Sequence, residues 1–230
     1  MITIVTINYN NEQGLSKTLS SVQNLPDEKG TFEFIVIDGG STDGSLDLIA
    51  KNKDIIDYII SEQDAGIFDA MNKGMLQAKN DWVIFMNSGD VFSSDFALSL
   101  IPRSWLKSNN NLIYGNKIEN GKSIKPGQKR LLEYGVIHAC HQAMLIRNKY
   151  QYNLKYKIYG DYEIVSRLYL LGADKFRYLD VDVCQREEGG VSREVSLRKR
   201  YEKFLAVYEV FGLKKLMVSL FYRLLRKHES

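Results

Sequence analysis

The residues best suited to chemistry in this sequence come directly after short apolar stretches. Asn87-Ser88-Gly89-Asp90 follows the apolar run 82–86, and Asp38-Gly39-Gly40 follows the run 32–37. A carboxylate held by a glycine-containing turn suits a divalent cation that carries phosphates. An acid after a strand can instead accept hydrogen bonds from a ribose or a base. Either motif taken alone is also consistent with an ordinary turn.

Alternating apolar strands and amphipathic helices predict how these motifs are positioned. The expected strands are 2–7, 32–37, 55–60 and 82–86, and the expected helices are about 12–23, 42–50 and 67–79. This order is typical of a parallel, doubly wound α/β sheet, in which ligands bind at the carboxyl ends of the strands. Asn8-Tyr9, Asp38 and the turn that ends at Asp90 should therefore meet at one edge.

The second half of the chain is less regular. We expect a short helix at 95–101, ended by Pro102, and strands at 112–116, 143–146 and 176–183. The polar stretch 119–129 indicates a hairpin or a mobile loop.

A second chemical centre opens the next predicted helix at Tyr159-Gly160-Asp161. Asp161 stands in the first turn, where the helix dipole favours an ionised acid, so taken alone it is consistent with a capping residue or with a functional carboxylate. Glu163 is a weaker alternative base. The nearby His138-Ala139-Cys140-His141 does not predict a zinc site, because a structural site needs four ligands and no second cluster follows.

Composition narrows the function classes. The chain has 230 residues, 44% hydrophobic and 26% charged, with a net charge of +3, which is too small to indicate a nucleic-acid partner. A dinucleotide oxidoreductase is excluded because no G-x-G-x-x-G follows the first strand. Two cysteines predict no disulfide framework, and neither a signal peptide nor a membrane span is expected.

The segment E-Q-D-A-G-I-F-D-A-M-N-K-G at 62–74, followed by F-M-N-S-G-D at 85–90, resembles the nucleotide-sugar half of family-2 glycosyltransferases. The similarity extends from 2 to 192 and includes Gly-Gly-Val-Ser at 189–192. It is greatest for the branch that builds exopolysaccharides and O-antigens, including colanic-acid-type transferases.

The resemblance implies a fold, a metal and a set of site residues. The fold is of the GT-A type, a Rossmann-like, mostly parallel sheet flanked by helices, with a nucleotide-sugar half (1–92), an acceptor half (93–192) and C-terminal amphipathic helices (193–230). Asp161 corresponds to the catalytic base, and Asp90 to the ligand of Mg²⁺ or Mn²⁺. The residues implied in binding the nucleotide sugar are Asn8, Tyr9, Asp38, Asp64, Gly66, Asp69, Asn72, Asn87, Ser88, His141 and Gln142. For Asp69 and Asn72, helix capping and a solvated helix face remain the alternatives, and for His141 a structural role does.

Two positions depart from the pattern of these transferases. At the metal motif many relatives carry two acids, whereas this chain has Ser88-Gly89-Asp90 with a single acid. At the position of the catalytic base many relatives carry Glu-Asp, whereas this chain has Gly160-Asp161, so only the second acid is present. With one carboxylate, metal affinity without nucleotide should be weak.

The C-terminal segment 193–230 carries ten Lys or Arg and four acids, so its net charge is +6 and the rest of the chain carries −3. An apolar stripe from Phe211 to Leu225, surrounded by basic residues, predicts two helices broken near Gly212 that lie on an anionic membrane. Packing of the stripe on the core and a homodimer contact are the alternatives, and the oligomeric state stays open.

These observations support an inverting glycosyltransferase, cytoplasmic and peripheral on the inner face of the cell membrane. It would move a sugar from a nucleotide sugar, expected to be UDP-linked, to a hydroxyl of a lipid-linked bacterial surface polysaccharide. The alternative is a catalytically inactive nucleotide-sugar-binding subunit of a polysaccharide assembly complex. The sequence does not identify the sugar, the acceptor hydroxyl or the pathway.

Overall fold

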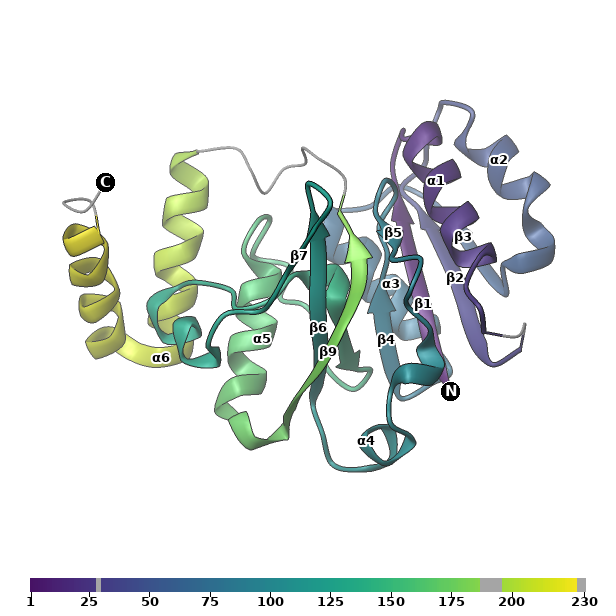
Figure 1. The fold of residues 1–230 in the computed structure, drawn as a ribbon. Helices are drawn as coiled ribbons and strands as arrows, with labels where there is room; N and C mark the ends of the chain where they lie inside the picture. The colour runs from purple at the N-terminus through teal and green to yellow at the C-terminus, as the bar shows by residue number, and fades with distance from the viewer. Residues whose placement is uncertain (28–29, 187–195, 227–230) are drawn as a thin grey trace.

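The structure, a computed structural model, describes residues 1–27, 30–186 and 196–226. Its first half is a parallel sheet in the order β3-β2-β1-β4 (Figure 1). The strands are β1 (Ile2–Asn8), β2 (Phe32–Asp38), β3 (Tyr58–Ser61) and β4 (Trp82–Phe85). The predicted α/β fold with parallel strands in this half is therefore confirmed.

Successive strand residues point to opposite faces of the sheet, and in β1, β2 and β4 the residues on both faces are mostly apolar. Helices therefore cover both faces. Ile2 and Ile4 of β1, which point to one face of the sheet, pack on Leu15 and Leu19 of α1 (Glu12–Gln23). The helix α2 (Ser45–Lys51) lies on the same side. Val5 and its neighbours pack instead on Met71 of α3 (Ile67–Gln77), behind the sheet. Sheet and helices together form a core that holds the carboxyl ends of the strands in place.

The third strand differs from its prediction of 55–60. Residues Lys53–Ile55 form a 3₁₀ turn, and β3 begins only at Tyr58. The Asp57 carboxylate accepts a hydrogen bond of 2.8 Å from the Phe34 N–H, which occupies the backbone position where a longer strand would pair.

The second half adds mainly antiparallel strands to the same sheet. β8 (Met144–Arg147) pairs antiparallel with β4, and β6 (Leu112–Glu119) pairs with β8. β9 (Phe176–Gln185) runs parallel to β6, and β5 (Val91–Phe92) closes the order. β7 (Lys122–Ile124) makes a hairpin with β6 through Asn120-Gly121, both at positive φ as a tight hairpin turn requires. The hairpin alternative for 119–129 is therefore the one observed.

The prediction of a helix at 95–101 is wrong. Only Leu98–Leu100 form a 3₁₀ turn there, and the short helix α4 (Arg103–Lys107) begins directly after Pro102. Proline lacks a backbone N–H and has a helical φ, so it suits the start of a helix better than its interior.

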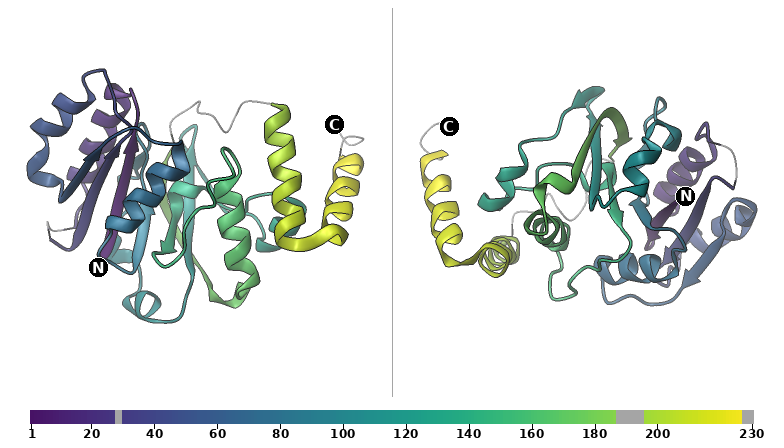
Figure 2. Two further views of the ribbon diagram at one scale, coloured as in Figure 1. Left: turned by 180° about the vertical axis from the view of Figure 1, so that it is seen from behind. Right: turned by 90° about the horizontal axis from the view of Figure 1, so that it is seen from below.

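The last two helices lie side by side (Figure 2). α5 (Gly160–Leu170) buries Ile164 and Leu168 in the cluster that also holds Ala206 and Val207 of α6 (Leu197–Arg226). Gly212, at φ 81°, breaks α6 into two arms as the sequence predicted. The first arm is thus part of the core, and the expected boundary at 192 lies outside the described residues.

Within the described chain, no helix combines the length and apolar character needed to cross a membrane. Cys140 and Cys184 are both free thiols.

Candidate functional site

Asn8 and Asp38 end neighbouring strands and are paired in register. Asp38 is fully buried, and its carboxylate accepts hydrogen bonds from Asn8 Nδ2 (2.9 Å), Ser41 Oγ (2.5 Å) and Ser61 Oγ (2.8 Å). Burial alone would raise the pKa of Asp38, but the hydrogen bonds from Ser41, Asn8 and Ser61 outweigh it and hold the pKa below its usual value. An ionised Asp38 therefore ties the loops after β1, β2 and β3 together.

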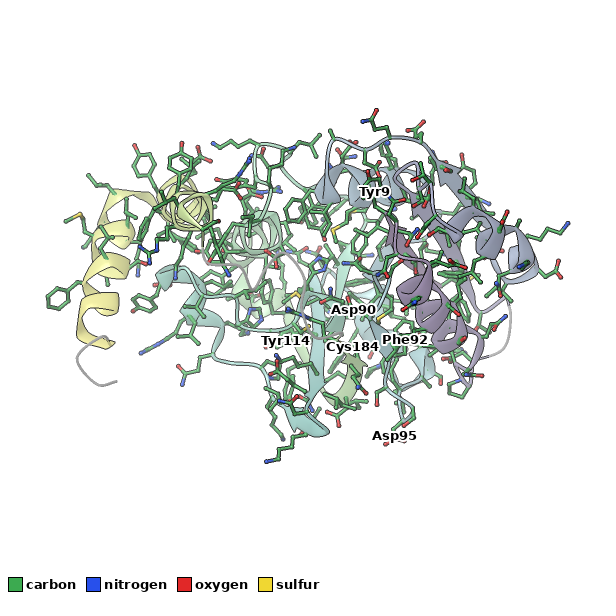
Figure 3. The ribbon with its side chains drawn as sticks, turned by 90° about the horizontal axis from the view of Figure 1, so that it is seen from above. Tyr9, Asp90, Phe92, Asp95, Tyr114 and Cys184 are labelled. Atoms are coloured by element: carbon green, nitrogen blue, oxygen red, sulfur yellow. The ribbon has the colours of Figure 1, made fainter. Side chains whose placement is uncertain are left out.

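Tyr9 and Asp64 meet above Gly39, beside this buried acid. The Tyr9 side chain is 67% exposed at the upper edge of the sheet (Figure 3). A Cβ atom at Gly39 would lie 2.9 Å from Asp64 Oδ2 and 3.2 Å from Tyr9 Cδ2, so any larger residue there would displace one of these side chains. An exposed ring next to a carboxylate can stack on a base and accept a hydrogen bond from it.

Lys73 of α3 lies among three acids at the same end of the sheet. Its Nζ is 2.6 Å from Asp64, 2.8 Å from Glu62 and 3.7 Å from Asp69. Asp69 also accepts a hydrogen bond of 2.9 Å from the Ala65 N–H, so the capping alternative describes its contacts. The ion pair with Lys73 orients the Asp64 carboxylate.

Gly66 precedes α3 at φ 123°, a conformation that favours glycine. Asn72, one turn further along α3, is buried. Its side chain donates to the Tyr152 carbonyl (2.9 Å) and accepts from the Tyr152 N–H (2.8 Å). Asn72 therefore clamps the backbone of Tyr152, which neither the capping nor the solvated-face alternative anticipated.

The turn after β4 is held by Thr18 of α1. Thr18 Oγ1 contacts the carbonyls of Asp90 (2.7 Å) and Asn87 (3.1 Å) and accepts a hydrogen bond from the Gly89 N–H (3.0 Å). Asp90 is 7% exposed, and in the view of Figure 3 it lies between Tyr9 and Cys184 of β9.

Three buried oxygens gather at these strand ends: Asn8 Oδ1, Asn87 Oδ1 and Ser88 Oγ. None of them has a hydrogen-bond partner among the described residues. Buried polar atoms are nearly always paired, so unpaired oxygens on adjacent loops favour a ligand-binding site.

Asp161 stands in the first turn of α5, and its Oδ1 accepts a hydrogen bond of 2.7 Å from the Tyr162 N–H. Burial raises the pKa of Asp161 to about 6, while the Tyr162 N–H and the charge of Arg186 act in the opposite direction. A carboxylate of this kind is ionised at neutral pH and basic enough to accept a proton.

Glu163 is not equivalent to Asp161. Its Oε1 forms an ion pair with Arg167 at 2.8 Å, and the residue is buried. This contact makes Glu163 a poorer candidate base than Asp161.

His141 and Tyr152 join the two halves of the site. His141 Nε2 and the Tyr152 hydroxyl are 2.6 Å apart, and the tyrosine ring stacks on Phe68 of α3 at 5.3 Å. Burial lowers the pKa of His141 to about 4, so it is neutral at physiological pH. Burial and the negative charge of Asp161 both raise the pKa of Tyr152. Gln142, next to His141, accepts from Cys140 Sγ at 3.2 Å.

Arg186, which the sequence reasoning did not single out, follows the end of β9. Gln185 pairs antiparallel with Val91, so the register places Arg186 opposite Asp90. Its charge also lowers the pKa of Asp161. The only sequence signal was a basic residue directly after a strand that ends near the site; Gly189 to Ser192 lie outside the described residues.

Comparison with known proteins decides the family. The sequence model described as Glycosyl transferase family 2 matches residues 3–171. The chain belongs to glycosyltransferase family 2.

Curated relatives of this glycosyltransferase extend over most of its length. The PGL/p-HBAD biosynthesis glycosyltransferase of Mycobacterium bovis is 28% identical over 201 residues, covering 82% of this chain and 78% of the relative. The poly-beta-1,6-N-acetyl-D-glucosamine synthase of Staphylococcus aureus is 29% identical over 141 residues, covering 60% of this chain and 34% of that protein.

Solved structures confirm the GT-A fold. Residues 1–349 of S. aureus TarS, in complex with UDP-GlcNAc, superpose with a TM-score of 0.70 at 17% identity, covering 90% of this chain and 65% of that one. Glucosyl-3-phosphoglycerate synthase from Mycobacterium tuberculosis, in complex with Mn²⁺, UDP and glucosyl-3-phosphoglycerate, gives 0.63 at 18% identity, covering 93% and 80%. The glycosyltransferase spans only 38% of the longer TarS chain.

The residues at the turn after β4 fit a divalent cation that is shared with phosphates. Asp90 offers carboxylate oxygens of the kind that such a cation prefers, and the neighbouring Asn87 Oδ1 and Ser88 Oγ have no hydrogen-bond partner among the described residues. No group of three His, Cys, Asp or Glu in the described part of the chain could hold a metal alone. Phosphate oxygens of the nucleotide sugar would have to complete the coordination.

A separate cavity of about 440 Å³ opens between Lys155 and α6, lined by Arg198, Tyr201, Glu202 and Leu205 as well. None of the residues implied in donor binding lines it.

Proposed function

We propose that this glycosyltransferase moves a sugar from a UDP-sugar to an acceptor hydroxyl with inversion at the anomeric carbon. The observation that supports this most is the cluster of unpaired buried oxygens beside Asp90, close to the exposed Tyr9 ring and to Asp64. These groups provide sites for a diphosphate and for a base along one sheet edge. The solved complex of TarS with UDP-GlcNAc, on the same fold, supports a UDP-linked donor.

The roles of the residues follow from their chemistry. Tyr9 stacks on the base, and Asp64 accepts a hydrogen bond from the base or the ribose. Asp90 would hold the metal ion, which would supply positive charge to neutralise the diphosphate. The remaining steps belong to the second half of the chain.

Asp161 removes the proton from the acceptor hydroxyl. The acceptor oxygen then forms a bond to the anomeric carbon on the face opposite UDP, and the electrons of the broken bond leave with UDP. General-base help of this kind contributes roughly 10²–10⁴-fold. A single displacement through one base produces inversion.

The second arm of α6 supports a lipid-linked acceptor. Leu213, Met217, Leu220 and Phe221 recur at helical spacing and are all exposed, 37% to 62%. On its inner side, Ser219 donates a hydrogen bond of 2.9 Å to the Tyr134 carbonyl, which fixes the exposed face outward. The segment that carries this stripe has a net charge of +6. An apolar stripe on a basic helix suits the anionic cytoplasmic face of the cell membrane.

Binding to nucleotide sugars tests the donor half of the proposal. Isothermal titration with a panel of UDP- and GDP-sugars, in Mn²⁺, Mg²⁺ or EDTA, should show metal-dependent binding of one UDP-sugar that Asp90→Asn weakens at least tenfold. Equal binding in EDTA would contradict the metal role of Asp90. Tight binding without release of UDP in the presence of any glycan acceptor would favour the inactive binding subunit.

Vesicle sedimentation tests the membrane half. Wild-type protein should bind vesicles that contain anionic lipid, and the double exchange Leu213→Asp with Phe221→Asp should abolish this binding. Leu197→Asp, at a still more exposed leucine on the first arm of α6, is the control and should have no effect. Unchanged sedimentation of the double variant would refute the membrane assignment and leave a second copy of the chain as the occupant of the stripe.

A further inference from the structure

The backbone that leads into α5 is held by a side chain from α6. Glu202 accepts hydrogen bonds from three consecutive N–H groups, those of Lys157 (3.0 Å), Ile158 (2.8 Å) and Tyr159 (3.1 Å). These N–H groups precede the first residue of the helix, Gly160. One carboxylate from a remote part of the sequence thus sets the path of the chain just before the catalytic helix.

The surroundings of Glu202 keep its carboxylate buried and ionised. It is 3% exposed, and Arg198, one turn earlier on α6, donates a hydrogen bond of 2.9 Å to it. Burial would raise the pKa of Glu202, but the hydrogen bonds from Arg198 and from the three backbone N–H groups lower it overall. The group is therefore a stable anion, and charge-assisted bonds of this kind are stronger than neutral ones.

A second carboxylate on the same side of α6 extends the contact. Glu209, seven residues after Glu202, accepts a hydrogen bond of 2.7 Å from the Tyr156 hydroxyl and forms an ion pair with Lys155. Figure 1 shows the first arm of α6 beside α5 along this stretch. Two acids two turns apart therefore fix consecutive residues from 155 to 159.

The next residue of the same backbone, Gly160, lies against a ring. A Cβ atom on Gly160 would lie 2.6 Å from Phe68 Cε2, so the chain passes against this ring without room for a side chain. The start of α5 is consequently in contact with Phe68 of the nucleotide-sugar half, directly after the segment that Glu202 of α6 holds. Asp161 is the next residue.

We infer that Glu202 is a positioning residue for catalysis: its carboxylate fixes the backbone of 157–159 and thereby the direction from which Asp161 reaches the acceptor. The inference rests on the proposed role of Asp161 as base. It makes the first arm of α6 part of the catalytic unit. Small displacements of a catalytic group are costly, since about 1 Å can reduce the rate roughly 10²-fold.

The test compares Glu202→Ala, Glu202→Gln and a matched surface control, Glu119→Gln, in the full-length protein. Glu119 is also paired with a basic residue, Lys117 at 3.0 Å, but on the β6–β7 hairpin. We expect Glu202→Ala to lower kcat about 10²-fold, and Glu202→Gln to lower it less, because the amide keeps one oxygen to accept from the N–H groups. The control should match wild type.

Donor binding and pH dependence separate positioning from general damage. The Kd for UDP measured by titration should stay within about twofold in both Glu202 variants, because the predicted donor residues lie on other elements. The acid limb of the kcat–pH profile, expected at about 6 for wild type, should move to lower pH as water reaches Asp161.

Wild-type kcat in the folded Glu202→Gln and Glu202→Ala variants would overturn the inference, and so would a loss of kcat that parallels a loss of UDP affinity. Asp161→Asn distinguishes this failure from failure of the proposed function. If Asp161→Asn abolishes turnover while the Glu202 variants do not reduce it, only the positioning role is wrong. If Asp161→Asn keeps turnover, the base assignment itself is wrong.

Discussion

Replacing Asp161 with Asn removes the proposed base and, at the same time, a partly buried negative charge. Burial raises the pKa of Asp161 to about 6 from an ordinary value of 3.8. The difference between these values corresponds to up to about 3 kcal/mol of lost folding free energy at pH 7. The variant should therefore lose turnover by roughly 10²–10⁴-fold and yet be more stable than wild type.

The sign of the effect follows from proton binding. Between pH 3.8 and about 6, the folded protein holds a proton on Asp161 that the unfolded chain has released. Wild-type stability due to this group therefore falls as pH rises through that window. The variant's advantage should be complete at pH 7, shrink below pH 6 and vanish at about pH 3.5. Wild-type kcat should also fall about tenfold between pH 7 and pH 5 as the base becomes protonated.

Urea unfolding followed by tryptophan fluorescence measures this stability, since Trp82 is buried in the core. Asp95→Asn, at an exposed acid, is the control and should change neither turnover nor the unfolding midpoint at pH 7. Full turnover of Asp161→Asn would refute its role as base. Lost turnover without added stability at pH 7 would refute the argument that burial raises its pKa.

Three further exchanges test the scaffold of the site. Thr18→Val removes the hydroxyl that holds the turn after β4, so metal-dependent UDP binding in a titration should weaken about tenfold, whereas Thr18→Ser should bind as wild type. Asn72→Ala leaves the Tyr152 backbone unpaired and should cost about 2–3 kcal/mol in urea unfolding; an unchanged midpoint would contradict the clamp. Gly160→Ala drives a Cβ into the Phe68 ring and should cost about 1–3 kcal/mol, most of which Phe68→Leu should restore in the double variant; additive losses would argue against the clash.

The parallel half of the fold could be predicted from the sequence because each of its strands and turns is encoded in a short stretch of neighbouring residues. Each apolar strand of this half ends in a polar turn, and parallel strands bring these turns to one edge. Asn8 and Asp38 are indeed paired in register there. The strand predicted at 55–60 begins only at Tyr58, because the Asp57 carboxylate accepts a hydrogen bond from the Phe34 N–H. Hydrophobic periodicity does not reveal such a side-chain contact.

The roles of residues whose partners lie far away in the sequence could not be predicted in this way. Thr18 lies among the apolar residues of α1, yet its hydroxyl bonds to a turn about 70 residues later. Asn72 and Tyr152 are 80 residues apart, and Glu202 contacts a segment more than 40 residues before it. No pattern within one window of sequence contains both members of such a pair.

The acidic surroundings of Lys73 have a consequence for the direction in which a nucleotide enters. Lys73 with Glu62, Asp64 and Asp69 gives these four side chains a net charge of −2 at the end of the sheet proposed for the base. A diphosphate that approached this end first would be repelled, while a neutral base would not. If Tyr9 and Asp64 bind the base as proposed, this charge would favour entry of the base at the acidic end and leave the phosphates on the side of Asp90.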